Sequence, residues 1–311
     1  MKILITGGAG FIGSHLADAL LARGDQVVIV DNFATGQRRN IPKGAEFHNI
    51  TLGATPISKE SDILLAVDWK SIDVVVHAAA SYKDPHDWRT DVLTNVVGAA
   101  DLLKAMLAKG KQRVIYFQTA LVYGLKPPPF PIPIDQPQSP IGSSYAVTKT
   151  AAENLIASSG LDFVSFRLAN CYGPRNVSGP VPTFYRKLIG GETCTVVDTK
   201  RDFIYVSDLV TLVLKAIDGR GHGYYHVSSG NDARIADLYY AVCEAMGMNK
   251  PASVRGRTPD DVETILLDPS KTEQEFDWRA VTPLREGIRR AIEYYKEFGV
   301  GETYTHLKLE K

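Results

Sequence analysis

The N-terminal third of the chain constrains its fold most. The apolar run KILIT has the length of a strand and leads into a glycine-rich turn, GGAG. Residues Ser14–Arg23 then have the pattern of a helix, and a second apolar run, VVIVD, ends at Asp31. A strand, a glycine turn, a helix and a second strand predict a βαβ unit of the dinucleotide-binding type.

The alternation continues through the first half of the chain. DVVVHAAA, RVIYFQ and FVSFRLAN read as buried strands, and Ile63–Val67, Thr94–Lys109 and Tyr145–Ser158 read as helices. This pattern predicts an α/β fold with a doubly wound parallel (Rossmann) sheet. The proline-rich stretch Lys126–Gly142 is expected to be a loop beside the active site, because proline neither pairs in a sheet nor continues a helix.

The alternation weakens after Asn170. Residues Thr183–Gly190 are expected to form a helix and Thr195–Val197 a strand, and RDFIYVSDL resumes the strand–helix style. We therefore expect an NAD-binding Rossmann domain over residues 1–168, to which 201–217 returns. Residues 169–311 are expected to form mainly a smaller, mixed α/β substrate lobe.

Composition excludes several classes of partner. The 311 residues include 35 basic and 35 acidic side chains, so no net field attracts nucleic acid or a membrane surface. No apolar run approaches the length of a membrane span. The three cysteines match no metal spacing, and His86 with Asp87 lacks a third ligand nearby, so no metal site is expected. A cytoplasmic protein with reduced thiols is the expectation.

The glycine loop and the acid after it predict the cofactor. Gly8, Gly10 and Gly13 follow a strand and open a helix, which lets a diphosphate approach backbone N–H groups. Asp31 ends the next strand, where a carboxylate bonds the ribose hydroxyls of the adenosine. The same charge repels a 2′-phosphate, so NAD is favoured over NADP.

A Tyr-x-x-x-Lys pair supplies the chemistry. Tyr145 and Lys149 are one helical turn apart and face the same side of the helix, and Thr119 ends a strand upstream. An ammonium group near a phenol favours the phenolate, which is a base for a hydroxyl proton while hydride leaves the same carbon. Cofactor site and base together predict a redox enzyme.

These motifs resemble the extended short-chain dehydrogenase/reductase superfamily. TGGAGFIGSHL, DNFATG, DVVVHAAA, Asn95-x-x-Gly98, TALVYG, YAVTK, RLANCYGPRN and RDFIYVSDL occur in the family's order, and DDVETILLDPSKTEQEFDW extends the match. They are similar to the NAD-dependent nucleotide-sugar epimerase/dehydratase branch. The resemblance implies Thr119, Tyr145 and Lys149 as catalytic residues. It implies a cofactor site made of Gly7, Gly10, Phe11, Ile12, Gly13, Asp31, Asn32, Phe33, Thr35, Gly36, Asn49, Ile50, Ala78, Ala79, Ala80 and Asn95, together with Tyr145 and Lys149.

The resemblance also implies a nucleotide sugar, most simply a UDP-sugar, as substrate. The expected contacts are Lys83, Thr119, Asn170, Arg201, Asp261 and Ile265. Three positions depart from the family pattern. Asn49 replaces an aspartate, VVDTK shortens the segment before Arg201, and Thr258 replaces an arginine. The last two change the walls of the nucleotide pocket.

The residues after Thr119 bear on the type of reaction. A 4,6-dehydratase of this family has an Asp-Glu pair there, and this chain has Ala120 and Leu121, which cannot move protons. We therefore expect 4-epimerisation of a UDP-hexose or N-acetylated UDP-hexose through a 4-keto sugar, in surface polysaccharide biosynthesis. A dehydratase or 4-keto reductase of the same family is the alternative, and a non-catalytic NAD-binding sensor is a second one.

Three further expectations concern single features. The helices over Thr94–Lys109 and Tyr145–Ser158 are apolar over broad arcs, and in the family such helices form a homodimer contact. Ile265 stands where a side chain decides whether a 2-acetamido group fits beside the hexose. A second Tyr-x-x-x-Lys pair, Tyr304…Lys308, is expected to lie on the surface, distant from the cofactor.

Overall fold

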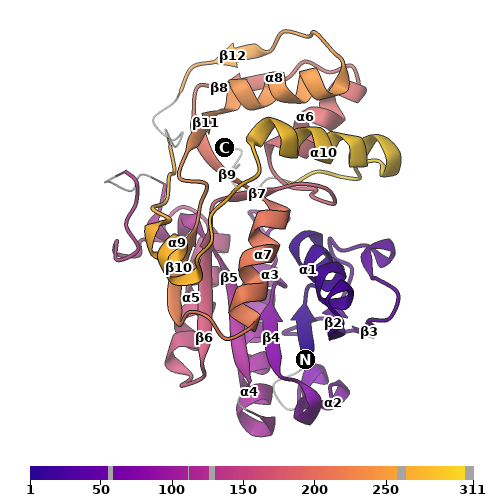
Figure 1. Cartoon of the computed structure of the whole chain (residues 1–311), viewed down its shortest axis with the longest axis vertical. Helices are drawn as coiled ribbons and strands as arrows, with labels where there is room; N and C mark the ends of the chain where they lie inside the picture. Colours follow the sequence, from indigo (N-terminus) through magenta and orange to yellow (C-terminus); the bar gives the residue numbers. More distant parts are fainter. Residues whose placement is uncertain (55–58, 111, 126–129, 258–263, 305–311) are drawn as a thin grey trace.

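A seven-stranded parallel sheet forms the centre of the molecule (Figure 1). The computed structural model describes residues 1–54, 59–110, 112–125, 130–257 and 264–304, and within them the strand order is β10-β6-β5-β4-β1-β2-β3. The strands are β1 (Lys2–Thr6), β2 (Gln26–Asp31), β3 (Glu46–Asn49), β4 (Val74–His77), β5 (Arg113–Thr119), β6 (Phe163–Leu168) and β10 (Gly223–Val227). The order reverses between β1 and β4, and doubly wound sheets bind their ligands at such a point. The predicted fold class is confirmed.

Helices cover both faces of this sheet. On one face lie α1 (Phe11–Ala22) and α7 (Val206–Ile217), and on the other α2 (Asp62–Ala66), α4 (Gly98–Lys109) and α5 (Ser144–Ser158). Successive strand residues serve the two faces in turn: Ile3 and Ile5 pack with α1, and Leu4 packs with α4. Burial on both faces explains why the strands are continuous apolar runs.

Two elements of the sheet could not be predicted from apolar runs. β3 has the sequence EFHN, lies at the sheet edge and is partly exposed, so little apolar signal marks it. β10 has the sequence GYYHV and pairs with β6 as the opposite edge. Edge strands need less apolar character than central ones because neighbours cover them less.

The helix expected over Thr94–Lys109 has a different form. α3 (Trp88–Asp91) leads into a wide π-helical turn, η3 (Val92–Val97), and α4 begins only at Gly98. Asn95 in this turn is buried and bonds to neighbouring segments on both sides, and π-turns often occur at such functional positions. Short 3₁₀ turns occur at η1 (Arg38–Asn40), η2 (Trp69–Ser71) and η4 (Ala120–Tyr123).

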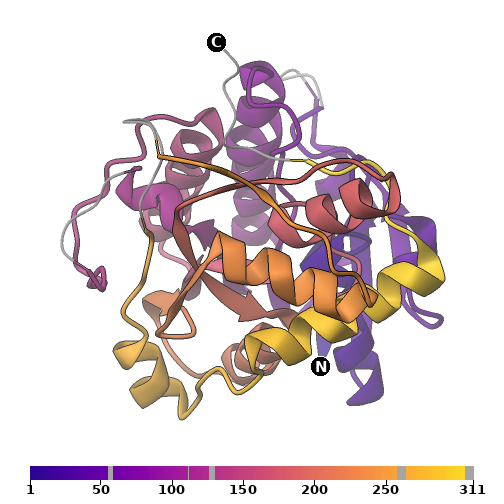
Figure 2. The same cartoon turned by 90° about the horizontal axis from the view of Figure 1, so that it is seen from above.

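A smaller lobe sits beyond the carboxyl ends of the strands. It contains a three-stranded sheet of β11 (Asp232–Arg234), β9 (Lys200–Tyr205) and β7 (Asn170–Tyr172), and a parallel pair of β12 (Ser253–Arg255) and β8 (Thr195–Val197). α6 (Pro180–Ile189), α8 (Ile235–Met246) and α10 (Leu284–Phe298) pack together over these strands, and Figure 2 shows α8 and α10 side by side. α9 (Ser270–Phe276) lies against β10.

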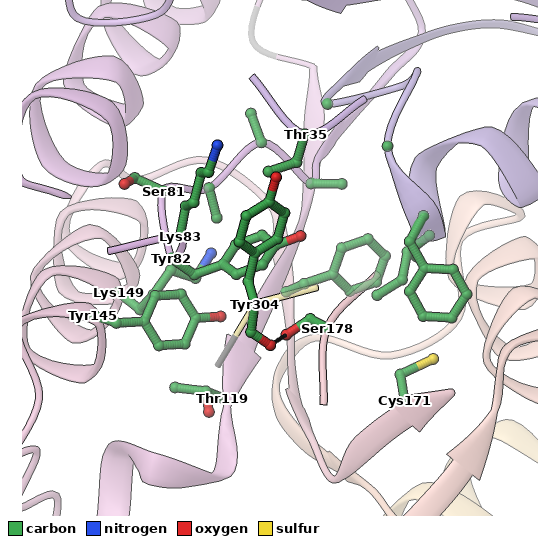
Figure 3. A pocket seen from close by; sticks show the side chains of 18 of the residues that line it. Thr35, Ser81, Tyr82, Lys83, Thr119, Tyr145, Lys149, Cys171, Ser178 and Tyr304 are labelled. Carbon is green, nitrogen blue, oxygen red and sulfur yellow. Dashed lines mark hydrogen bonds between the residues drawn. The ribbon is translucent and has the colours of Figure 1, made fainter. Parts of the chain in front are cut away.

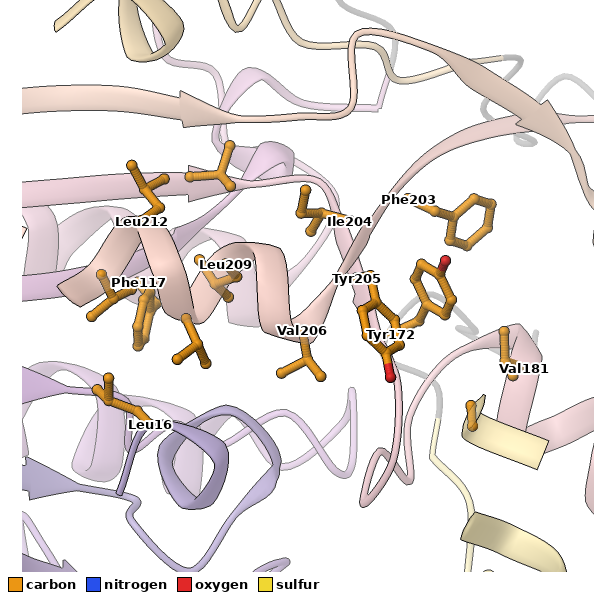
Figure 4. Close-up of a cluster of buried hydrophobic side chains, with 14 of the residues drawn as sticks. Leu16, Phe117, Tyr172, Val181, Phe203, Ile204, Tyr205, Val206, Leu209 and Leu212 are labelled. Carbon is orange, nitrogen blue, oxygen red and sulfur yellow. The ribbon is translucent and has the colours of Figure 1, made fainter. Parts of the chain in front are cut away.

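One hydrophobic cluster joins the sheet to the lobe (Figure 4). It includes Leu16 of α1 and Leu209 of α7, and continues without interruption to Tyr172, Phe203 and Val181 of the lobe. The lobe is therefore packed onto the sheet through α7. Among the residues described, no helix is both long enough and apolar enough to cross a bilayer.

Candidate active site

A cavity of about 800 Å³ lies between the carboxyl ends of the strands and the lobe (Figure 3). This volume is at the upper end of the roughly 300–1,000 Å³ typical of ligand sites. Its lining comes from the glycine loop, the segments after β2, β4 and β5, the start of α5, and β7 and β9. The cavity thus joins the predicted cofactor and substrate residues.

The glycine loop is packed too tightly for other residues. Gly7 has φ of +70°, and a Cβ atom there would stand 2.7 Å from the Ala79 nitrogen. A Cβ atom on Gly13 would stand 2.4 Å from the Gly7 oxygen. α1 then starts at Phe11 without a side-chain cap, so its first N–H groups point toward the cavity edge as an anion site requires.

Asp31 lies at the end of β2 and is 8% exposed. Its carboxylate accepts hydrogen bonds from the Ala9 N–H (3.0 Å) and the Phe33 N–H (2.7 Å), and so ties the glycine loop to the loop after β2. Burial raises the pKa of Asp31, and these backbone hydrogen bonds oppose that shift. The position of the carboxylate suits a ribose, since it lines the cavity beside Asn32 and Thr35.

Most of the predicted cofactor residues line this cavity. They are Gly7, Gly10, Phe11, Ile12, Gly13, Asp31, Asn32, Thr35, Ile50, Ala78, Ala79, Ala80, Tyr145 and Lys149. Phe33, Gly36, Asn49 and Asn95 are not among its lining residues. Gly36 instead packs against Asp31, and Asn49 ends β3 opposite Asp31.

Asn95 positions the wall of the cavity and does not line it. Its side-chain oxygen accepts from the Ser81 N–H (2.8 Å). Its amide donates to the Ser81 carbonyl (3.1 Å) and to the Thr148 hydroxyl (3.0 Å). It therefore fixes the segment after β4 against α5, the helix that carries Tyr145 and Lys149.

The Tyr145–Lys149 pair stands on the first two turns of α5. Ser143 caps this helix by accepting from the Ala146 N–H (3.4 Å), and Tyr145 and Lys149 both line the cavity. Beneath them, the Tyr116 hydroxyl donates to the Lys149 carbonyl (3.0 Å). The Lys149 ammonium lies 4.0 Å from the centre of the Tyr116 ring.

Burial governs the protonation of both groups. It lowers the pKa of Lys149 to about 7, although Glu153 one turn further along favours the charged form. It raises the pKa of Tyr145, and the neighbouring Tyr82 and Asp91 raise it further. The pKa of Tyr145 is therefore raised by burial and not lowered by Lys149 as expected, and the Lys149 ammonium lies over the Tyr116 ring.

Thr119 ends β5 and lines the cavity with Tyr145 (Figure 3). Its hydroxyl oxygen accepts a hydrogen bond from the Leu121 N–H (3.2 Å), so Thr119 caps the short turn η4. This bond uses a lone pair and leaves the hydroxyl proton available to a substrate oxygen. Ala120 and Leu121 of the same turn are buried, and both line the cavity.

The predicted substrate residues that the structure describes all line the same cavity. They are Lys83, Thr119, Asn170, Arg201 and Ile265, whereas Asp261 and Thr258 lie outside the described residues. The Asn170 amide donates to the Asp202 carbonyl (3.1 Å), and the Arg201 guanidinium donates to the Lys200 carbonyl (2.6 Å). Ile265 is buried beside Ala120 and Leu121.

The lining residues that the sequence analysis did not assign to the site include Tyr82, Glu302 and Tyr304. Tyr82 follows β4 and lies edge-on to Tyr145, with ring centres 6.3 Å apart. Glu302 and Tyr304 come from the end of the described chain. The interpretation of Tyr304 as a surface residue distant from the cofactor site was wrong, because the chain after α10 returns to the cavity. Local sequence gives no signal for such a return.

The comparisons with known proteins agree with this geometry. A family model described as "NAD dependent epimerase/dehydratase family" matches residues 3–227. The Bordetella bronchiseptica enzyme WbmH, solved in complex with NAD⁺, is 46% identical and superimposes with a TM-score of 0.89 over 96% of this chain and 99% of that one.

Two curated relatives span nearly the whole chain. The UDP-N-acetyl-α-D-glucosaminuronate decarboxylase of Bacillus cytotoxicus is 38% identical, covering 95% of this chain and 98% of the relative. The UDP-glucose 4-epimerase of Mycolicibacterium smegmatis is 30% identical, covering 95% and 99%. With the glycine loop, Asp31 and the Thr119–Tyr145–Lys149 arrangement in one cavity, the chain belongs to the NAD-dependent epimerase/dehydratase family and is an NAD-dependent enzyme.

Proposed function

We propose that this protein is a nucleotide-sugar 4-epimerase acting on a UDP-hexose or an N-acetylated UDP-hexose. The observation that carries the proposal is the meeting of Thr119, Tyr145 and Lys149 in the cavity that also contains the glycine loop. A sensor protein of the same fold has no need of this triplet. The names of two relatives, a UDP-glucose 4-epimerase and a UDP-sugar decarboxylase, support a UDP-sugar as substrate.

Each member of the triplet has a proposed role. Tyr145 accepts the proton of the sugar 4-hydroxyl and returns it after the sugar has turned. Thr119 donates a hydrogen bond to the same oxygen. Lys149, beneath Tyr145 on α5, supplies positive charge when it is protonated. Bound NAD⁺ would supply a hydride acceptor and donor for C4 of the sugar, and its positive charge would favour the Tyr145 phenolate.

Binding roles follow from position. The cavity-lining residues of the glycine loop and Asp31 are proposed to hold the diphosphate and the adenosine ribose of NAD. Asn49 and Ile50 are proposed near the adenine, at the end of β3. Phe33, Gly36 and Asn95 would support the cofactor site through their neighbours. Asn170, Arg201 and Lys83 are proposed to contact the nucleotide sugar, and a guanidinium suits its diphosphate.

The turn after Thr119 argues against dehydration. Removal of water across C5 and C6 needs a base and an acid near those carbons, and Ala120 and Leu121 line the cavity with apolar side chains. Epimerisation needs only space for the keto sugar to turn. Ile265, buried against the same turn, is proposed to admit a 2-acetamido group where a larger ring would exclude it.

Decarboxylation of a UDP-uronic acid is the second candidate, because the Bacillus cytotoxicus relative is named for that activity. A 4-keto uronic acid loses CO₂ readily, since the ketone stabilises the electrons left at C5. C5 must then be protonated. Ala120 and Leu121 provide no acid for this step, which favours epimerisation.

Product identification tests the proposal. The purified enzyme is incubated with UDP-glucose, UDP-N-acetylglucosamine and the two matching UDP-uronic acids, and products are separated by chromatography. Epimers without loss of mass support the proposal. Loss of CO₂ supports the decarboxylase, and an unsaturated or deoxy product supports a dehydratase. Ile265→Tyr is expected to reduce turnover of the N-acetylated sugar more than that of UDP-glucose.

Several further expectations stay predictions. We propose a cofactor part over residues 1–168, to which 201–217 returns, and a substrate lobe made mainly of residues 169–311. The shared core in Figure 4 supports their acting as one packed unit. A cytoplasmic location, a role in surface polysaccharide synthesis and a homodimer are also proposed.

A further inference from the structure

The last described residues cross the mouth of the cavity. After α10 ends at Phe298, the chain returns to the segment between β7 and α6. The Tyr304 N–H donates to the Val177 carbonyl (3.1 Å), and the Gly179 N–H donates to the Tyr304 carbonyl (3.2 Å). Ser178 and Gly179 line the cavity themselves, so the chain end is bonded to one of its walls.

Side chains bond the same chain end to the opposite wall. The Lys83 ammonium lies 3.4 Å from a Glu302 carboxylate oxygen and 4.7 Å from the centre of the Tyr304 ring. The Tyr304 hydroxyl donates to Glu302 (3.0 Å). Lys83 belongs to the segment after β4, which carries Tyr82 above Tyr145. We call the Lys83, Glu302 and Tyr304 side chains the latch.

Tyr304 shares the cavity with the reacting groups. It lines the cavity with Thr119 and Tyr145, and Figure 3 shows its backbone beside Ser178 and its side chain extending toward Thr35 and Lys83. The Lys83 and Glu302 side chains are 49% and 64% exposed, so the ion pair is a weak one that can open. An ion pair that can open and close suits a reaction in which the ligand must enter the cavity and the intermediate must then stay in it.

We infer that Tyr304 is a substrate-contacting residue of this site, and that the latch holds it over the nucleotide sugar so that the keto intermediate stays in the cavity while it turns. The inference rests on the proposed function. The intermediate has given its C4 hydride to the cofactor, so a keto sugar that escapes leaves the cofactor reduced. Retention of the keto sugar therefore decides whether a reaction cycle is completed.

The test compares three variants and one control. Glu302→Lys places like charges together, Glu302→Asp keeps the carboxylate that pairs with Lys83, and Tyr304→Ala removes the ring. Arg285→Glu disrupts another exposed ion pair, with Glu244, whose two residues are not among those that line the cavity, and serves as the control. Circular dichroism and NAD titration establish that each variant is folded.

Two measurements are made on the NAD-loaded enzyme. The first is the dissociation rate of a fluorescent UDP analogue by stopped flow, which does not depend on catalysis. It should rise about fivefold in Glu302→Lys and roughly tenfold in Tyr304→Ala, and stay within about twofold of wild type in Glu302→Asp. The second is the absorbance of reduced nicotinamide left after turnover, which should accumulate in Glu302→Lys and Tyr304→Ala and not in Glu302→Asp or the control.

The outcomes separate the alternatives. Unchanged dissociation in both Glu302→Lys and Tyr304→Ala would overturn the inference. Faster association at an unchanged dissociation rate would also overturn it, since Tyr304 would then be a plug that blocks entry. If the dissociation rates change as expected but no epimer forms with any UDP-sugar, the latch stands and the proposed function fails.

Discussion

Tyr145 and Lys149 show how burial acts on single residues. Loss of solvent disfavours charge on both, so the pKa of the phenol rises and the pKa of the ammonium falls to about 7. Because little solvent reaches this pair, we expect the protonation of both groups to depend on the molecules that bind beside them. We therefore expect the base to be activated when NAD⁺ and substrate bind.

The Tyr145 hydroxyl is expected to carry the proton transfer. Tyr145→Phe keeps the ring and its packing against Tyr82, so the cavity should retain its shape. Turnover should fall by about 10²–10⁴-fold, the usual contribution of a positioned acid–base group. Steady-state kinetics measure the loss, and calorimetry should find NAD affinity nearly unchanged. Activity within a few-fold of wild type would contradict the assigned role.

Lys149 is expected to lower stability at neutral pH. The residue is 2% exposed, and its pKa of about 7 lies far below its ordinary value of 10.5. Below pH 7 the amine is charged in both the folded and the unfolded chain. The full free-energy cost of burying that charge then lowers the stability of the folded protein. Between pH 7 and 10.5 only the unfolded chain binds the proton, so stability rises with pH and the cost disappears.

Replacement of this ammonium tests the argument. Lys149→Met in the cofactor-free protein should be more stable than wild type by roughly 1–4 kcal/mol at pH 6, while turnover is lost. The difference should shrink as the pH rises from 7 toward 10.5. Urea titrations at several pH values measure it. A Lys149→Met protein that is less stable at pH 6, or a difference that grows with pH, would refute the prediction.

At the scale of elements, α4 and α5 each have a buried and an outward side. Leu102, Leu103 and Met106 of α4 pack on the sheet with Ile156 of α5, and so they cannot contact a partner. Leu107, Val147 and Leu155 face outward and are 44%, 48% and 40% exposed. These side chains are the part of the predicted arcs that a second subunit could cover.

The proposed homodimer depends on this outward side. Leu155→Glu places a charge in the centre of the proposed contact and should shift a dimer to monomer in light scattering at micromolar concentration. Val281→Glu changes another exposed aliphatic residue, 70% exposed, outside these helices and should leave the mass unchanged. A wild-type monomer, or a Leu155→Glu dimer of unchanged stability, would exclude this contact.

At the scale of the whole molecule, cofactor binding connects the sheet to the lobe. The cavity has walls from both, so NAD should stabilise the protein as a unit and raise its unfolding temperature. At about 100 times its dissociation constant, a ligand adds about 2.7 kcal/mol to the stability. NADP at the same concentration should have little effect, because Asp31 repels a 2′-phosphate. Equal shifts with the two cofactors in calorimetry would refute the charge argument.

Local patterns in the sequence are enough to predict the central strands and the tight glycine loop. The strands from β1 to β6, apart from β3, are buried on both faces, and this burial requires continuous apolar runs that are visible in the sequence. The tight approach at Gly7 and Gly13 admits only glycine, so those positions are also marked. Tyr145 and Lys149 lie one helical turn apart, and the period of an α-helix predicts that their side chains share one face.

The remaining features depend on contacts between segments that are distant in the sequence. Tyr304 reaches the cavity by backbone pairing with residues far earlier in the chain, and backbone pairing leaves no side-chain pattern. Asn95 forms hydrogen bonds with Ser81 and Thr148 on two other segments, and the residues next to Asn95 in the sequence do not predict these bonds. The protonation of Tyr145 and Lys149 depends on how much solvent the folded chain excludes. Local patterns record which face of an element is buried, whereas folding decides which distant segments meet there.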